Sequence, residues 1–321
     1  MMNVRRLLKE FDIQPRKGLG QNFLTDQRAL ERIVEAAELG PEDVVLEIGP
    51  GLGTLTRLLA ERAGRVIAVE LDQRLVEALR QTATAKADLP NVEIIRGDIL
   101  EMNPADLLER HVGSQLLAVG CVQPSVASRR QAAGSAPLPS QSWGERGAGA
   151  NYDALSLQYK VVANLPYYIT SAILRHLLTA EVRPKLMVVT VQLEVARRII
   201  AQPGDMSLLA VSVQFYGQPR IVTRVRAGAF YPSPQVDSAV IRIDLHRHPV
   251  VEVDDAGSFF EVVRAGFAQR RKQLRNALAA ELNLPASEVA QALSRAGVNP
   301  RRRAQTLSIE EWVRVWREMQ T

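Results

Sequence analysis

One short stretch of the chain has residue types suited to holding an aromatic amine. An apolar run, residues 161–163, leads into Asn164-Leu165-Pro166-Tyr167. The run predicts a buried strand, which Pro166 ends because it cannot donate to a sheet ladder. The Asn164 side-chain oxygen and the backbone carbonyl of Leu165 or Pro166 can accept from one amino group, and Tyr167 offers a flat face beside them. The same letters also fit a strand end with a proline turn and core tyrosines, so the pattern alone leaves both interpretations open.

A glycine-rich loop supplies a second candidate site. Residues 49–53, Gly-Pro-Gly-Leu-Gly, separate a predicted buried strand at Val44–Ile48 from a predicted helix that runs from Thr54 to about Ala63. Glycines at such a junction let the backbone approach a ligand closely. The next predicted strand, Arg65–Val69, is followed by Glu70. An acid at this place can accept hydrogen bonds from both hydroxyls of a ribose.

The spacing of this loop indicates which nucleoside cofactor it suits. Glu47 lies two positions before the first glycine, giving Glu-x-Gly-x-Gly-x-Gly rather than the G-x-G-x-x-G of dinucleotide-binding enzymes. The former pattern is typical of methyltransferases that use S-adenosylmethionine (SAM). A third predicted strand, Val92–Arg96, ends at Gly97-Asp98, and Asp98 can accept from the amine of a bound adenine. Carboxyl ends of strands are where open α/β sheets bind ligands.

The remaining elements place these residues in an α/β domain. The chain has 321 residues, of which 46% are apolar and 23% charged, enough for one large domain and a small one. Helices and strands alternate, which predicts a largely parallel sheet. Apolar periodicity predicts helices at Gln27–Ala37, Ser171–Leu178, Leu193–Ala201 and about Ser207–Tyr216, and strands at Lys185–Val191, Arg220–Val225 and Ser238–Asp244.

Composition excludes several classes of protein. No apolar run is long enough to cross a membrane, and the N-terminal residues lack the apolar segment of a secretory signal. Cys121 is the single cysteine, and the four histidines lack metal-ligand spacing. We therefore expect a cytoplasmic protein with no structural metal. The net charge of +5 favours a polyanionic partner only weakly.

Basic residues are concentrated near the C-terminus. From His248 onward the chain is predicted to be helical, and residues 260–321 carry eleven Lys or Arg against six Asp or Glu. The densest clusters are Arg270-Arg271-Lys272 with Arg275, and Arg301-Arg302-Arg303; Arg16-Lys17 form a smaller one. If Arg271 and Arg275 lie on one helix, their spacing puts them on one face. Such clusters fit phosphate contacts, although charge runs are more often solvated helix faces.

The connection between Asp98 and Asn164 is longer than an α/β crossover requires. Residues 99–163 number 65, and thirteen of the 32 residues at 120–151 are Gly, Pro or Ser. This segment has neither helical nor strand periodicity. We predict that about residues 111–158 form a disordered surface insert.

Taken in order, these motifs resemble the small-subunit (16S) ribosomal RNA adenine N6,N6-dimethyltransferase family, of the KsgA/RsmA type. The resemblance covers nearly the whole chain apart from the insert. Its motifs are Gly-Leu-Gly-Gln-Asn-Phe-Leu at 18–24, Glu-Ile-Gly-Pro-Gly-Leu-Gly-Thr-Leu-Thr at 47–56, Glu70-Leu71-Asp72, Gly97-Asp98, Asn164–Tyr167, Phe-x-Pro-x-Pro-x-Val-Asp-Ser-Ala-Val at 230–240, Phe-Ala-Gln-Arg-Arg-Lys-Gln-Leu-Arg-Asn at 267–276 and Leu-Ser-Ile-Glu-Glu at 307–311.

The resemblance implies an α/β fold: a Rossmann-like, seven-stranded class I SAM-dependent methyltransferase domain at residues 1–246, and a small all-α RNA-binding domain at 247–321. The cofactor-binding residues that it implies are Asn22, Leu24, Gly49, Gly51, Glu70, Asp98 and Asn164. By the same resemblance, Asn164 and the Pro166 carbonyl receive the target amine, Tyr167 stacks on the target base, and Phe230 lies on its other side.

The implied reaction transfers methyl groups from SAM to N6 of two adjacent adenosines in the 3′-terminal hairpin loop of small-subunit rRNA. The implied partners are this RNA and the immature small subunit, and we expect a monomer that needs no metal. The RNA-binding residues expected are Arg16, Lys17, Arg270, Arg271, Lys272, Arg275, Arg301, Arg302 and Arg303. One departure is Tyr168, where many family members have Asn.

Three other functions remain open from the sequence. The sister group that methylates large-subunit RNA and confers macrolide resistance shares the cofactor motifs, but the C-terminal motifs at 267–276 and 307–311 favour the small-subunit group. A SAM-binding assembly factor without turnover is the second. An NAD-dependent dehydrogenase is the third, and it lacks a convincing catalytic His or Tyr-Lys pair.

Overall fold

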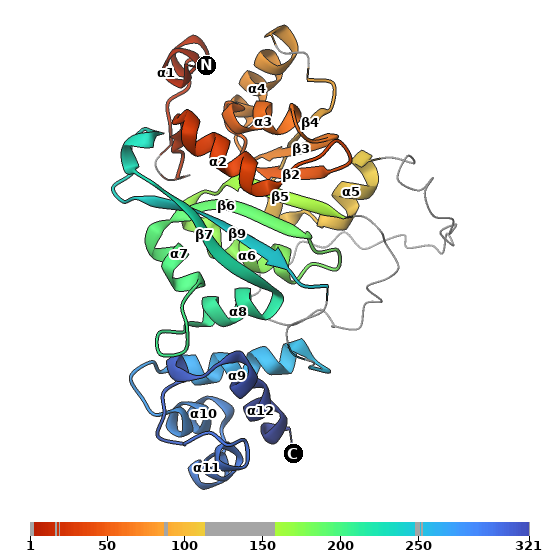
Figure 1. The fold of residues 1–321 in the computed structure, drawn as a ribbon. Coiled ribbons are helices and arrows are strands. Elements are labelled where there is room, and N and C mark those ends of the chain that lie inside the picture. The colour runs from red at the N-terminus through yellow and green to blue at the C-terminus, as the bar shows by residue number, and fades with distance from the viewer. Residues whose placement is uncertain are drawn as a thin grey trace, which may run out of the picture.

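A computed structural model describes residues 3–16, 18, 20–86, 89–112, 158–247, 251 and 253–320. Its centre is a seven-stranded sheet in the order β4-β3-β2-β5-β6-β9-β7 (Figure 1). The strands are β2 (Val44–Ile48), β3 (Arg65–Glu70), β4 (Val92–Arg96), β5 (Tyr159–Asn164), β6 (Leu186–Gln192), β7 (Gly217–Val225) and β9 (Ser238–Leu245). Apart from its two ends, the predicted insert at 111–158 lies outside the described residues.

The connections of the sheet create one place where a ligand can bind. The strands from β4 to β6 are parallel, whereas β9 runs antiparallel to β6 and β7 runs antiparallel to β9. From β2 the chain proceeds outward through β3 to β4, and then returns to β5 on the other side of β2. The loops after β2 and β5 therefore leave the same edge of the sheet in different directions. That divergence opens a crevice at the carboxyl ends of these two strands.

Helices cover both faces of the sheet, as Figure 1 shows. Side chains alternate along each strand, so Val45 and Val162 pack with α2 and α3, whereas Leu46 and Val161 pack with the helices of the opposite face. The helices are α1 (Val4–Glu10), α2 (Gln27–Ala37), α3 (Thr54–Ala60), α4 (Gln73–Lys86), α5 (Pro104–Val112), α6 (Thr170–Leu178), α7 (Leu193–Ile199), α8 (Leu208–Tyr216), α9 (Ala256–Ala268), α10 (Leu274–Leu282), α11 (Ala286–Arg295) and α12 (Ile309–Met319).

Helix α2 shows why the sequence predicts this domain well. It begins after Asp26, whose carboxylate accepts from the Ala29 backbone N–H at 2.8 Å and caps the helix. Its apolar positions, such as Ile33 and Ala37, are buried against the sheet. The helix has the predicted bounds. By contrast, the two-stranded ribbon of β1 (Phe23–Leu24) and β8 (Phe230–Tyr231) was not predicted, because two residues carry no periodicity.

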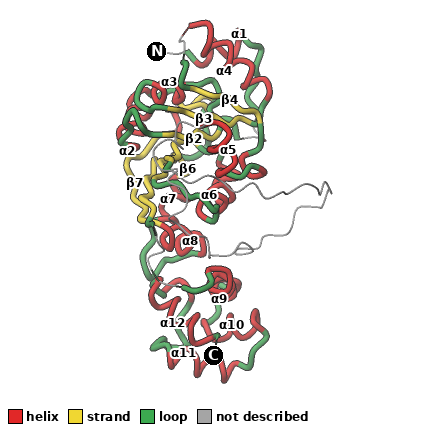
Figure 2. The backbone as a smooth tube through the Cα atoms, turned by 90° about the vertical axis from the view of Figure 1, so that its right-hand side faces the viewer, coloured by secondary structure: helices red, strands yellow, loops and turns green. Residues whose placement is uncertain are grey.

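The C-terminal helices α9 to α12 form a bundle at one end of the molecule (Figure 2). The predicted domain boundary at 246/247 falls between β9 and α9. Phe259 of α9 stacks on Phe215 of α8 with ring centroids 5.0 Å apart, and both rings are fully buried. The hydrophobic core therefore continues from the sheet domain into the bundle. Such packing limits independent movement of the two parts.

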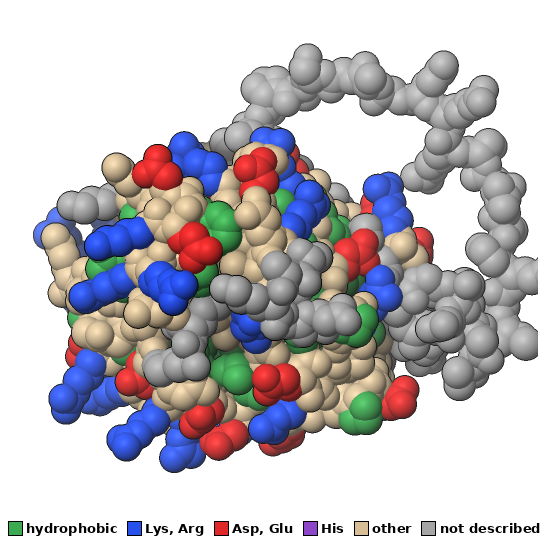
Figure 3. Space-filling model, turned by 90° about the horizontal axis from the view of Figure 1, so that it is seen from above, with side chains coloured by type: hydrophobic (Ala, Val, Ile, Leu, Met, Phe, Trp, Pro, Cys, Tyr) green, Lys and Arg blue, Asp and Glu red, His purple; other side chains and the backbone are tan. Residues whose placement is uncertain are grey.

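Charge is unevenly distributed over the face that bears α1 and α4. Seen from this side, Lys and Arg side chains gather along the left edge, the side on which the β7–β8 turn lies in Figure 1 (Figure 3). Arg28, Arg224 and Arg226 are among the exposed arginines of the sheet domain. Within the described part of the chain, no helix is long and apolar enough to cross a membrane, and no group of three His, Cys, Asp or Glu side chains could hold a metal ion.

A buried lysine joins α2 to the sheet. Lys160 of β5 is 6% exposed, and its Nζ donates to the carbonyls of Ala37 and Glu38 and, at 2.8 Å, to Asp43 Oδ2. It thereby satisfies carbonyls at the C-terminus of α2, where a cation is also favoured by the helix dipole. Asp43 has a second cationic partner in Lys185, whose side chain is 40% exposed.

We predict that Lys160→Met lowers the free energy of unfolding by about 2–4 kcal/mol, because it leaves buried acceptors without donors. The matched change Lys185→Met removes the exposed partner of the same carboxylate and should cost less than about 1 kcal/mol. Urea unfolding followed by circular dichroism measures both. Equal losses in the two variants would contradict the role assigned to Lys160.

Candidate active site

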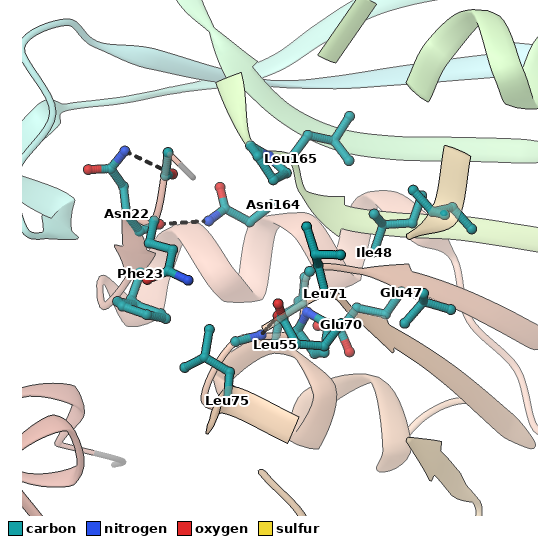
Figure 4. A pocket seen from close by; sticks show the side chains of 18 of the residues that line it. Asn22, Phe23, Glu47, Ile48, Leu55, Glu70, Leu71, Leu75, Asn164 and Leu165 are labelled. Carbon is teal, nitrogen blue, oxygen red and sulfur yellow. Dashed lines mark hydrogen bonds between the residues drawn. The ribbon is translucent and has the colours of Figure 1, made fainter. Parts of the chain in front are cut away.

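The pocket lies at the carboxyl ends of β2 and β5, as the topology requires (Figure 4). Residues 20–24, which we call the strap, form one wall. The loops after β2, β3, β4 and β5 form the rest of the lining. The pocket therefore brings together the glycine loop, Glu70, Asp98 and Asn164, which are far apart in sequence.

The glycine loop approaches the pocket with backbone instead of side chains. Gly49 and Gly51 both have positive φ, at 67° and 59°. A Cβ on Gly51 would lie 2.9 Å from the Phe23 ring, so only glycine allows the strap to pack there. Glu70 then fastens this loop to the neighbouring strand. Its Oε2 accepts from Gly51 N at 3.1 Å and its Oε1 from Asp72 N at 3.0 Å. The 7%-exposed carboxyl keeps further lone pairs for a ligand.

Glu47 is a second buried carboxyl at the pocket. It is 1% exposed, and burial raises its pKa to about 8. The charge of Glu70 adds to that shift. Thr56 Oγ1 and Glu47 Oε2 both lack a hydrogen-bond partner among the described residues. Glu47 is thus a protonated acid at neutral pH with one unused oxygen.

Asp98 adds a third carboxyl from the loop after β4. Its Oδ1 accepts from Leu100 N at 2.9 Å and caps a short 3-10 helix, Ile99–Glu101, which fixes the carboxylate at the rim. None of the described residues that line the pocket is Lys, Arg or His. Three carboxyls without a basic side chain favour a ligand that carries positive charge and hydroxyl or amino donors.

The side chain of Asn164 supplies a hydrogen-bond acceptor that has no partner among the described residues. Its Nδ2 donates to the backbone carbonyl of Asn22 at 3.0 Å, shown as a dashed line in Figure 4. This bond identifies the nitrogen end of the amide, since only a donor can face that carbonyl. Asn164 Oδ1 is buried and has no partner in the described chain. A buried oxygen in this state is costly unless a ligand donor meets it, so it marks a binding position.

The second acceptor differs from the predicted one. The Pro166 carbonyl already accepts from Thr170 Oγ1 at 3.1 Å and from Ile169 N at 3.3 Å, because Pro166 caps the short 3-10 helix Tyr167–Ile169 that precedes α6. The Leu165 carbonyl accepts no hydrogen bond from the described residues, and Leu165 lines the pocket. The geometry therefore favours Leu165, which the residue pattern alone had left open, over Pro166.

The aromatic residues also need one correction. Tyr167 lines the pocket as predicted, and its hydroxyl is hydrogen-bonded to Ser238 Oγ at 2.7 Å, which holds the ring in place. Burial raises the pKa of Tyr167, so it remains a phenol. Phe230, predicted to face the target base, is 4% exposed and packs in the core, because its strand pairs with Leu24. The other rings at the pocket are Phe23 of the strap, which is 8% exposed, and Tyr168, which is 54% exposed.

Two further residues that the resemblance implies at the cofactor also lie at the pocket. Asn22 and Leu24 belong to the strap and line the pocket. The pocket fits SAM on its own chemistry: a glycine cradle for close contact, Glu70 for ribose hydroxyls, Asp98 for an amine, and the unpartnered Glu47 oxygen for an N–H or O–H donor.

Comparison with known proteins agrees with this fit. Residues 13–321 match the family model described as ribosomal RNA adenine dimethylase. The chain belongs to this family. A protein named ribosomal RNA small subunit methyltransferase A from Dehalococcoides mccartyi is 43% identical over 97% of this chain and 91% of its own. A protein of the same name from Moorella thermoacetica is 42% identical over 98% of this chain and 96% of its own.

Solved structures of related folds confirm the architecture of this dimethylase. The 23S rRNA methyltransferase ErmE aligns with a TM-score of 0.63 at 27% identity, covering 94% of this chain and all of its own. A dimethyladenosine transferase from Plasmodium falciparum aligns with a TM-score of 0.66 at 21% identity, covering 91% and 95%. The predicted class I SAM-dependent methyltransferase fold with C-terminal helices is confirmed, as is the dependence on SAM.

The basic residues of the dimethylase form a shared surface. Arg270, Arg271 and Lys272 are exposed in the turn between α9 and α10, so the predicted helical face joining Arg271 and Arg275 is wrong. Two backbone bonds, Leu274 N to Arg302 O at 2.7 Å and Arg275 N to Pro300 O at 3.4 Å, bring the second cluster alongside. We call Arg270, Arg271, Lys272, Arg275, Arg301 and Arg303 the basic surface.

Two predicted RNA-binding residues stand apart from this surface. Arg302 donates to both oxygens of Glu311 and to Thr306 Oγ1, so its guanidinium holds α12 in place. Arg16 precedes the strap, and its backbone N–H donates to Gln21 Oε1. Lys17 lies outside the described residues.

Sequence reasoning also missed a groove beside the pocket. Thr25, Asp26, Gln27 and Arg28 line one side of it, and residues 228–229 line the other. Thr25 N and Oγ1 both donate to the Ala229 carbonyl and hold the two segments together. No sequence signal pairs these segments, since 204 positions separate Thr25 from Ala229.

The raised pKa of Glu47 makes stability depend on pH. Between its ordinary pKa of 4.5 and its folded value of about 8, the folded state binds one more proton than the unfolded state. Stability must therefore fall as pH rises through this range, with a slope of at most about 1.4 kcal/mol per pH unit from this group. Glu70, whose pKa is also raised by burial, contributes with the same sign.

We predict that Glu47→Gln gains stability relative to the wild type as pH rises from 5.5 to 8.5, because the amide stays neutral. Thermal unfolding at both pH values measures this, with the exposed Glu42→Gln as the matched control. A difference between Glu47→Gln and wild type that does not change with pH would exclude a neutral Glu47.

Proposed function

We propose that this protein transfers methyl groups from SAM to N6 of two adjacent adenosines in the 3′-terminal hairpin loop of small-subunit rRNA. The relatives named small subunit methyltransferase A support this substrate. The observation that carries the proposal is the buried, unpartnered Oδ1 of Asn164, a residue that lines the acidic pocket. The immature small subunit is the proposed partner, and the expectations of a cytoplasmic monomer stay predictions.

The residues divide into two groups around this oxygen. Glu70 holds the ribose of the cofactor, Asp98 holds its adenine, and Gly49 and Gly51 pass beside it. When bound there, SAM supplies an electrophilic methyl group on a sulfonium. The protein's task is then to bring one amine nitrogen in line with that methyl, which is catalysis by proximity and orientation.

The residues around the target adenine must also make its N6 amine, a poor nucleophile, reactive. The N6 lone pair of adenine is delocalised into its ring. Asn164 Oδ1 and the Leu165 carbonyl can each accept a hydrogen bond from one N6–H group, which favours a tetrahedral nitrogen with its lone pair directed at the methyl. Tyr167, held by Ser238, offers the face on which the base stacks, and Tyr168 is the exposed ring next to it. The base leaves its stack to reach this site, which costs least in a loop.

We predict that Asn164→Ala lowers the turnover number by about 100-fold or more, with SAM affinity changed only a few-fold. The assay is methyl transfer from labelled SAM to purified immature small subunits, with large subunits in parallel, followed by nucleoside analysis. N6,N6-dimethyladenosine in small-subunit RNA alone supports the proposal. Label in large-subunit RNA would transfer the assignment to the macrolide-resistance type. SAM binding without label in either would indicate an assembly factor.

A second prediction concerns the basic surface. Replacing Arg270, Arg271 and Arg301 by Gln should weaken RNA binding and reduce the slope of log affinity against log salt by roughly one for each lost phosphate contact. SAM affinity should not change. The matched control is Arg62→Gln, an exposed arginine of the sheet domain beyond the end of α3. An unchanged salt slope in the triple variant would exclude this surface from RNA binding.

A further inference from the structure

The orientation of the Asn164 amide depends on the strap. An asparagine amide can rotate by a half turn and exchange its oxygen for its nitrogen. In the rotated state the pocket would present two N–H donors to the target amine, which is itself a donor. The Asn22 carbonyl opposes this rotation, because it accepts from Asn164 Nδ2 at 3.0 Å and leaves Oδ1 as the unpartnered end of the amide. The contacts that hold the Asn22 carbonyl in place therefore determine whether Asn164 offers its oxygen or its nitrogen to a ligand.

Gln21 is the side chain that anchors this part of the strap. Its Nε2 donates to Asp72 Oδ2 at 3.1 Å, and its Oε1 accepts from Arg16 N at 2.8 Å. Asp72 is 6% exposed and is held by Arg74, which donates to both of its oxygens. These bonds keep Asp72 ionised, with a pKa lowered to about 2, so the Gln21 contact is charge-assisted.

The anchor also touches the cofactor side of the pocket. Asp72 N donates to Glu70 Oε1, and Glu70 Oε2 accepts from Gly51 N. A continuous series of contacts therefore runs from the proposed ribose acceptor, through Asp72 and Gln21, to the backbone next to Asn164. None of the catalytic roles assigned above uses Gln21 or Asp72.

We propose that Gln21 and Asp72 are positioning residues that hold the Asn164 amide with its oxygen toward the target amine. This inference rests on the proposed role of Asn164. It implies that the pair affects the chemical step more than it affects the binding of either substrate. Arg74 acts behind Asp72 by keeping its carboxylate in place.

The first variant is Gln21→Met, which keeps the length of the side chain and removes both of its hydrogen bonds. We expect the turnover number to fall by about ten-fold or more, while the KM for RNA and the Kd for SAM change by no more than a few-fold. The matched control is Gln73→Met, the same change on the exposed side of α4, next to Asp72 in sequence. It should keep wild-type kinetics.

The second variant, Gln21→Glu, tests the contact through pH. The charged groups facing position 21 are Asp72 and Arg74, with Glu70 behind them and the Tyr168 phenol beside the strap. At pH 8 the new carboxylate opposes Asp72, and turnover should fall. Near pH 5.5 the new carboxyl gains a proton and can donate to Asp72, so turnover relative to wild type should recover. Gln73→Glu should show no such recovery.

The outcomes separate the two proposals. If Asn164→Ala retains wild-type turnover, the assigned active site itself is wrong. If Asn164→Ala loses turnover but Gln21→Met matches Gln73→Met, the positioning role is overturned while the active site stands. The positioning role is also overturned if Gln21→Met loses SAM binding in proportion to turnover, or if Gln21→Glu stays impaired relative to wild type at low pH.

Discussion

The divergence of the chain between β2 and β5 is the constraint on which the rest of the site depends. Two neighbouring parallel strands end at the same edge, and their loops leave in opposite directions, so no crossover covers the gap. The cofactor loop follows one strand and the target-amine residues follow the other. In methyl transfer, the attacking nitrogen must be aligned with the methyl group and its sulfur. Because the two loops lie side by side at this edge, the fold can place both reactants there.

The chemistry of the pocket follows from what surrounds that gap. Glu47, Glu70 and Asp98 bring carboxyls, and the described lining contributes no basic side chain. Burial raises the pKa of Glu47 and of Glu70, and backbone N–H groups of Gly51 and Asp72 stabilise the Glu70 carboxylate. The exposed arginines of the basic surface lie elsewhere, on the α9–α10 turn and the segment beside it. The acidic pocket and the basic surface are therefore on different parts of the chain.

The C-terminal bundle is joined firmly to the catalytic domain. Stacking of Phe259 on Phe215, and a shared core across α8 and α9, tie the basic surface to the sheet. If the bundle binds RNA as proposed, this packing restricts the orientations in which the RNA can meet the pocket. Binding energy gained far from the reacting nitrogen can in this way contribute to its positioning.

The sequence by itself determined the order of helices and strands, the cofactor loop, Glu70, Asp98 and the Asn164 turn. These features are local: a buried strand, glycines with positive φ, and an acid at a strand end each leave a pattern within a few residues. Helix α2 illustrates this, because its cap, Asp26, directly precedes the eleven residues that carry its apolar face.

Only the tertiary structure decided how the side chains meet. The pairing of Phe23–Leu24 with Phe230–Tyr231 buries Phe230 and brings Tyr168, not Phe230, to the pocket. Hydrogen bonds to the Pro166 carbonyl leave Leu165 as the free acceptor, and Glu311 takes the guanidinium of Arg302. The Asn22–Asn164 contact spans 142 positions. Such contacts depend on long-range packing, which no local periodicity encodes.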